Sequence, residues 1–119
     1  MGKDIKLELS EDFGVDIMKL SSYLEGKKCN MAIITQIVKS GTSIGANIYE
    51  SLYAESDTDF IHKLKISQKE ASETRFWLKI LYRSGYIDNN YYHTLLEKCE
   101  SLIKILSAII KSTKQNSIF

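Results

Sequence analysis

Two pairs of acidic side chains stand at a spacing that places each pair on one face of a helix, namely Glu70 with Glu73 and Glu97 with Glu100. A di-iron site in a helical bundle requires Glu-x-x-His pairs on facing helices. Neither His62 nor His93 completes that motif, although His93 lies one turn before Glu97, where a side-chain hydrogen bond is possible. We therefore expect no metal, no cofactor and no catalytic residues. An enzyme that uses Glu70 and Glu73 is the least favoured alternative.

Other enzymatic motifs are missing from the sequence as well. It contains no P-loop, no dinucleotide-binding glycine pattern and no His-Glu-x-x-His zinc motif. The two cysteines, Cys29 and Cys99, are far apart and form no C-x-x-C pair, which argues against a disulfide framework and favours a reducing, cytoplasmic setting. Cys99 falls on an apolar seam, so it is better explained as a core residue than as a nucleophile paired with a histidine.

A row of cationic residues offers a different chemistry, which is contact with phosphate. Residues 57–84 predict one long helix, and at about 100° per residue its basic side chains gather on one face. They are Lys65, Lys69, Arg75, Lys79 and Arg83. The row spans about 27 Å at a rise of 1.5 Å per residue, which suits the backbone of RNA or DNA bound with little dependence on sequence. The alternative is a face that is only solvated.

A neighbouring stripe of the same helix mixes acidic and apolar side chains. This stripe contains Ile66 together with Glu70, Glu73, Trp77 and Ile80. A buried carboxylate needs a partner, and tryptophan is enriched at protein interfaces. We therefore expect Glu70, Glu73, Trp77 and Ile80 to lie at a contact between subunits. The alternative is a boundary position, in which the glutamates pair with residues of their own helix.

These residues belong to a chain that fits one domain. It has 119 residues, of which 44% are hydrophobic and 26% charged, which is ordinary for a globular protein. No stretch approaches the roughly 18 uncharged apolar residues of a transmembrane helix, so we expect no membrane contact. The net charge of +1 hides an asymmetry, because residues 1–59 hold six lysines against ten acidic residues, whereas residues 60–119 hold ten basic residues against five acidic ones.

The spacing of apolar residues predicts an all-α fold. Proline is absent, and apolar residues recur three and four positions apart almost throughout. Helices are predicted from a cap at Ser10 to Gly26, from about residue 30 to 55, from 57 to 84 and from about 89 to 112, with caps at Ser56 and Asp88 and a stop at Gly85. Short connections favour an antiparallel up-down-up-down four-helix bundle. We expect residues 1–9 and 114–119 to be loose tails.

The second predicted helix has small residues at its centre. Gly41 and Gly45 lie one turn apart, and a glycine in a helix costs about 1 kcal/mol relative to alanine. Close packing against another backbone or a large side chain would explain both. The third predicted helix has its own small seam, formed by Ser67, Ala71 and Thr74. We expect this seam to receive the glycine-marked part of the second helix, with a kink or a functional groove as the alternative.

Three stretches of the sequence carry a family resemblance. They are SGTSIGANIYES at 40–51, DFIHKLKISQKEASETRFWLKIL at 59–81 and the Gly85-Tyr86-Ile87 turn. Together they resemble the four-helix bundle family named for proteins encoded in intervening sequences of bacterial 23S ribosomal RNA genes. Phe76 stands where this family commonly has tyrosine. The resemblance implies an antiparallel bundle that assembles into a ring, commonly a pentamer, and relatives among the accessory proteins of diversity-generating retroelements bind nucleic acid through a basic surface.

We therefore predict a non-enzymatic, homo-oligomeric bundle that binds nucleic acid, such as structured RNA, through the basic row. The alternative of a different class is a protein-interaction scaffold whose basic row docks an acidic protein. An enzyme with an active site inside the bundle would require a metal or an enclosed pocket that holds Glu70 and Glu73.

Overall fold

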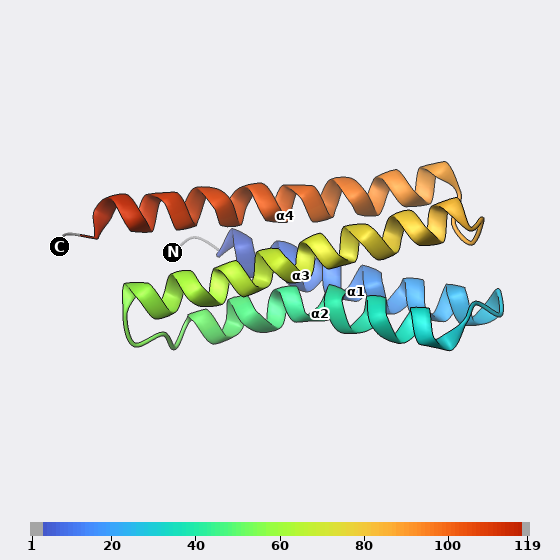
Figure 1. The fold of residues 1–119 in the computed structure, drawn as a ribbon, viewed down its shortest axis with the longest axis horizontal. Coiled ribbons are helices and arrows are strands. Elements are labelled where there is room, and N and C mark those ends of the chain that lie inside the picture. Colours follow the sequence, from blue (N-terminus) through green and yellow to red (C-terminus); the bar gives the residue numbers. More distant parts are fainter. Residues whose placement is uncertain (1–3, 118–119) are drawn as a thin grey trace.

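Four helices account for nearly the whole chain. The computed structural model describes residues 4–117 and contains α1 (Ile5–Gly26), α2 (Met31–Ser51), α3 (Asp57–Arg83) and α4 (Asn89–Asn116). Helices that follow one another in sequence pack side by side in opposite directions, and α4 returns to α1 to close the bundle (Figure 1). The bundle is elongated, with extents of 52 × 26 × 23 Å. The predicted all-α bundle is confirmed.

The apolar seams of the four helices meet in one core. Residues at heptad-like spacing are almost fully buried on every helix, among them Ile17, Leu20, Ile37, Ile44, Leu64, Leu78, Leu102 and Leu106. Burial of a leucine or isoleucine side chain stabilises the fold by about 1.5–3 kcal/mol. Because each helix contributes one such stripe, four helices are enough to enclose the core without metals or disulfides.

Two of the predicted helix caps are present. The Ser56 side chain accepts a hydrogen bond of 3.0 Å from the amide of Asp59, and the Asp88 side chain accepts one of 2.8 Å from the amide of Tyr91. Gly85 follows α3 with a φ of 82°, a left-handed conformation that glycine adopts without strain. Local sequence therefore defines both ends of the α3–α4 connection.

The predicted start of the first helix is wrong. α1 begins at Ile5, so residues 5–9 are helical rather than a loose tail; Asp4 precedes the helix without a capping hydrogen bond from its side chain, and residues 1–3 lie outside the described part of the chain. Ser10 is buried inside the helix, where its hydroxyl donates to the carbonyl of Leu7 at 3.0 Å. Leu7 and Leu9 pack against the core and hold this first turn in place. A serine that can cap a helix can also bond backward within one, and here packing decides.

Two other boundaries differ from the prediction. α2 ends at Ser51, four residues earlier than expected. The buried hydroxyl of Ser51 donates a hydrogen bond to the carbonyl of Ile48. α4 runs on to Asn116, although residues 114–119 were expected to be loose. The hydroxyl of Ser117 donates to Asp57 at the start of α3 at 2.6 Å, which ties the end of α4 to the bundle. Residues 118–119 lie outside the described range.

The Cβ positions of the two glycines of α2 face α1, while the small seam of α3 packs on the same part of α2, at Ser40 and Ile44. A Cβ atom built on Gly41 would lie 2.7 Å from Cγ1 of Ile17, and one on Gly45 would lie 3.2 Å from the hydroxyl oxygen of Ser10. The expected close packing is therefore present with a different partner. Gly41 makes room for one large side chain of α1.

The small seam of α3 packs on the adjoining side of α2 and on α4. The hydroxyl of Ser67 donates to the carbonyl of Ile44 at 2.8 Å, and the hydroxyls of Thr74 and Ser40 are 2.9 Å apart. The carbonyl of Ala71 accepts a hydrogen bond from the thiol of Cys99 on α4. The seam thus satisfies its buried polar groups by short bonds between helices.

Candidate functional site

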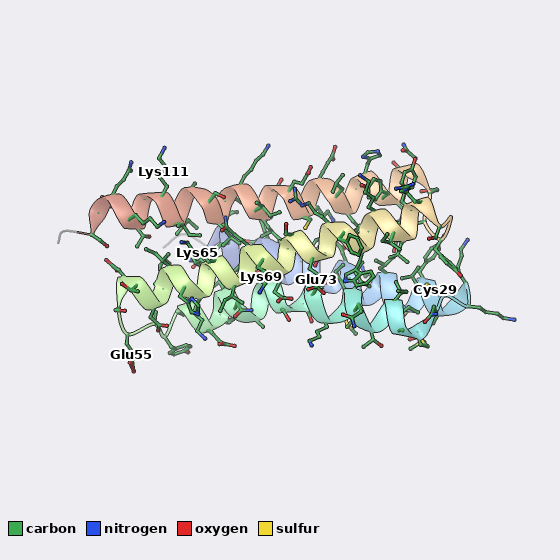
Figure 2. The ribbon with its side chains drawn as sticks, in the orientation of Figure 1. Cys29, Glu55, Lys65, Lys69, Glu73 and Lys111 are labelled. Atoms are coloured by element: carbon green, nitrogen blue, oxygen red, sulfur yellow. The ribbon has the colours of Figure 1, made fainter. Side chains whose placement is uncertain are left out.

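The basic row lies along α3, and most of it is free of acidic partners. Figure 2 shows Lys65 and Lys69 following one another along the helix. Lys65, Lys69, Lys79 and Arg83 are exposed, and no carboxylate of the described chain forms an ion pair with any of them. Arg75 differs, because it is half-buried and turned toward α4, where its guanidinium lies 3.5 Å from Glu100. Four of the five predicted cations are therefore available to a ligand.

The acidic and apolar stripe lies on the α2 side of α3. Trp77 is half-buried and packs against the core, and its indole N–H donates to the carboxylate of Glu73 at 3.2 Å. Glu73 is exposed, while Glu70 and Ile80 are partly exposed. One of the glutamates thus has the partner within its own helix that the alternative interpretation required.

An exposed aromatic ring that the sequence interpretation did not select lies between the two stripes. Phe76 is 54% exposed, and its ring meets the edge of Trp77 at a centroid distance of 4.9 Å. The helical period places residue 76 on the same face as the basic row, so the sequence could have indicated that this ring is exposed there. Phe76 therefore adds an exposed apolar side chain to the outer face of α3, next to the half-buried Trp77.

α4 adds cations that the sequence interpretation also missed. Lys104, Lys111 and Lys114 are exposed on the part of α4 nearest its C-terminal end. An open groove of about 320 Å³ separates α4 from α3 there, and Gln68 crosses it to donate a hydrogen bond of 2.7 Å to the hydroxyl of Ser107. The basic surface therefore extends over two adjacent helices.

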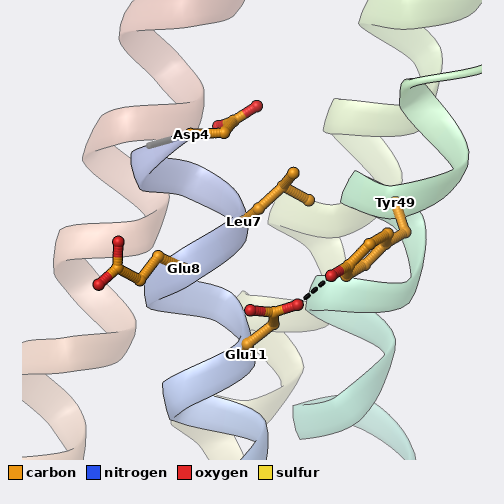
Figure 3. A pocket seen from close by; sticks show the side chains of 5 residues that line it. All are labelled: Asp4, Leu7, Glu8, Glu11 and Tyr49. Atoms are coloured by element: carbon orange, nitrogen blue, oxygen red, sulfur yellow. Dashed lines mark hydrogen bonds between the residues drawn. The ribbon is translucent and has the colours of Figure 1, made fainter. Parts of the chain in front are cut away.

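α1, which lies across the bundle from α3, is acidic. α1 holds five acidic residues and two lysines. Asp4, Glu8, Glu11 and Leu7 line an open pocket with Tyr49 of α2, whose hydroxyl donates to the carboxylate of Glu11 (Figure 3). That hydrogen bond raises the pKa of Tyr49. The charge asymmetry of the sequence thus becomes a division of the surface, with α1 negative and α3 and α4 positive.

The thiols are placed as core residues. Cys99 is completely buried, and burial raises its pKa to about 12. Burial also raises the pKa of Cys29. Among residues 4–117, no group of three or more histidine, cysteine or acidic side chains is arranged to hold a metal ion, and no helix is long and apolar enough to cross a membrane.

Fold and surface together define a small antiparallel four-helix bundle protein with one basic and one acidic side. Residues 5–108 match the sequence profile described as 23S rRNA-intervening sequence protein. The chain belongs to this family, which confirms the resemblance seen in the sequence.

A protein with unknown function from Bacteroides thetaiotaomicron, assigned to the S23 ribosomal protein family, is similar in sequence and in fold. Its crystal structure matches with a TM-score of 0.87 and 40% sequence identity, over 89% of this chain and 98% of that one. No curated protein matches the chain.

Proposed function

We propose that this protein is a non-enzymatic, homo-oligomeric bundle that binds structured RNA through the phosphate backbone. The observation that supports this most directly is a row of exposed cations on α3 that form no ion pair with a carboxylate of residues 4–117, namely Lys65, Lys69, Lys79 and Arg83. When lysine and arginine side chains along a helix neutralise phosphates, the nucleic acid releases its condensed counterions. Binding of this kind is sensitive to salt and depends little on the bases.

Charge reversal on α3 tests the proposal against a matched control. A Lys69→Glu/Lys79→Glu variant changes two exposed lysines of the basic row. The control, Lys19→Glu/Lys39→Glu, changes the net charge equally on α1 and α2. Gel-shift titrations with a structured RNA at several salt concentrations would compare the two. We expect the α3 variant to lose about tenfold or more in affinity, and to show a shallower salt dependence than wild type.

Two outcomes would refute this function. The first is an absence of RNA binding by the wild type at low salt, and the second is an equal loss in the two variants, which would mean that only net charge matters. Capture of an acidic protein that persists after nuclease treatment of the lysate would favour the scaffold alternative instead.

We further propose that a second copy of the chain covers the apolar side of α3. Phe76 and Ile80 are exposed or partly exposed and are absent from the side chains packed on the core, so they are free to meet a partner. If this side of α3 meets a different surface of the second copy, the contact between the identical subunits is head-to-tail. Contacts of this kind close into rings when the rotation permits, and a pentamer is the expected size.

A further inference from the structure

The groove between α3 and the last turns of α4 gathers positive charge. Its lining consists of Gln68, Ser107, Ile110, Lys111, Lys114 and Gln115, with no acidic side chain among them. Lys65 on α3 adds a third lysine beside this groove, because it lies about one turn before Gln68 on the helix side that meets the end of α4. Asp57 lies about two turns before Lys65, and its carboxylate accepts a hydrogen bond from Ser117.

The ammonium groups of Lys65 and Lys114 repel each other. The positive charge of Lys65 lowers the pKa of Lys114 from its ordinary value. Lysines gathered at one groove without an acidic side chain in its lining create a positive potential that attracts a ligand of negative charge. An anion placed between them would convert the repulsion into two charge-assisted hydrogen bonds.

The groove also has fixed hydrogen-bonding groups. The amide nitrogen of Gln68 donates to the hydroxyl oxygen of Ser107 at 2.7 Å and lies 3.5 Å from the carbonyl oxygen of Ile103. Because the Ser107 oxygen accepts this bond, its own proton can be donated to a ligand. Buried Ile110 forms the apolar part of the lining. Cations and a hydroxyl donor at one groove can bind a phosphate through charge-assisted hydrogen bonds.

We propose that this groove is a phosphate-binding site, in which Lys65 and Lys114 clamp the phosphate and Ser107 donates a hydrogen bond to it. The inference deepens the proposed function, since the phosphate would belong to the RNA backbone and the site would add α4 to the basic surface of α3. A free phosphate or a nucleotide has the same chemistry, so the experiment must separate these sources.

A neutral substitution on α4 tests the site in the full chain. Lys114→Gln removes one half of the clamp, and Lys19→Gln is the control, because Lys19 is exposed on α1 and belongs neither to the groove nor to the basic surface of α3 and α4. We expect Lys114→Gln to weaken RNA binding about threefold to tenfold and to reduce the salt dependence by about one phosphate contact. Lys19→Gln should weaken binding less than about twofold, because it removes no phosphate contact.

Titration with inorganic phosphate supplies the second arm. In wild type, the amide resonances of Gln68 and Ser107 should shift by NMR, and these shifts should disappear in Lys114→Gln. If RNA binds equally well to both variants and phosphate causes no shift of the amide resonances, the phosphate site is refuted. The proposed RNA function would remain. Shifts with phosphate but no RNA binding support the site as one for a free phosphate and refute the RNA function. If neither phosphate-induced shifts nor RNA binding is observed, both the phosphate site and the proposed RNA function are refuted.

Discussion

The hydroxyl oxygens of Ser40 on α2 and Thr74 on α3 lie 2.9 Å apart in a part of the core that excludes water. Thr74 also bonds the carbonyl of Glu70 in its own helix at 2.8 Å, while Ser40 lies 3.4 Å from the carbonyl of Ile37. The pair therefore joins two helices and keeps every hydroxyl partnered. Small side chains at both positions let the helices approach closely enough for this bond.

Removal of the Thr74 hydroxyl should weaken the bundle. Thr74→Val keeps the shape of the side chain and deletes the bond between helices, so we expect a loss of about 1 kcal/mol in the free energy of unfolding. Urea denaturation should show a lower midpoint with an unchanged slope. Thr94→Val is the control, because exposed Thr94 bonds only the carbonyl of Asn90 in its own helix. Equal losses in the two variants would assign no role to the contact with Ser40.

Two alanine substitutions at glycine should have opposite signs. Gly41→Ala would place a methyl group 2.7 Å from Ile17, and we expect overpacking to cost about 1–3 kcal/mol, more than the gain in helix propensity. Gly14→Ala is the matched variant, since no atom lies within 4 Å of its new methyl group; it should stabilise by up to about 1 kcal/mol. Thermal unfolding of the pair would show this, and stabilisation by both would contradict close packing at Gly41.

The buried thiol of Cys99 should resist labelling. Its pKa of about 12 in the folded protein exceeds the value of 9.0 for a free thiol. The stability gained by keeping it protonated is therefore fully present below pH 9 and is lost as the pH rises toward 12. In a Cys29→Ser background, a thiol reagent at pH 8 should react at the rate of unfolding, and rapidly once urea is added. Fast labelling of the folded protein would contradict this burial.

Substitutions on the outer face of α3 should alter assembly. Phe76→Ser and Ile80→Ser each remove apolar surface from the proposed subunit contact, so we expect smaller particles by light scattering than for wild type. Tyr53→Ser is the control, because this ring is 85% exposed and lies in the turn after α2. A wild type that is monomeric, or variants that assemble as it does, would exclude a contact through this face.

Much of the fold could be predicted, because the three- and four-residue spacing of apolar side chains indicates directly which residues of a helix face the core. Ile44, Leu78 and Leu102 follow from spacing alone, and Ser56 and Asp88 act as caps because their role depends only on neighbours in sequence. The period does not say which of two adjacent helices a residue will meet. For that reason the partner of Gly41 was predicted on α3 and found on α1.

The candidate site was predicted less completely. Its cations on α3 share one helix, so their common face can be derived from the helical period. Lys114 belongs to the same surface only because α3 and α4 lie side by side and because α4 continues past Ser112, where the prediction ended it. The exposure of Phe76 likewise depends on which sectors of α3 the neighbouring helices cover.

α4 extends eight residues beyond the segment that matches the family profile. Ile110 anchors this extension to the core, whereas Lys111, Lys114 and Gln115 are exposed on it. Replacement of these three side chains would change the charge of one end of the bundle and leave the buried packing untouched. The outer face of the end of α4 can therefore vary in sequence without any change in the core.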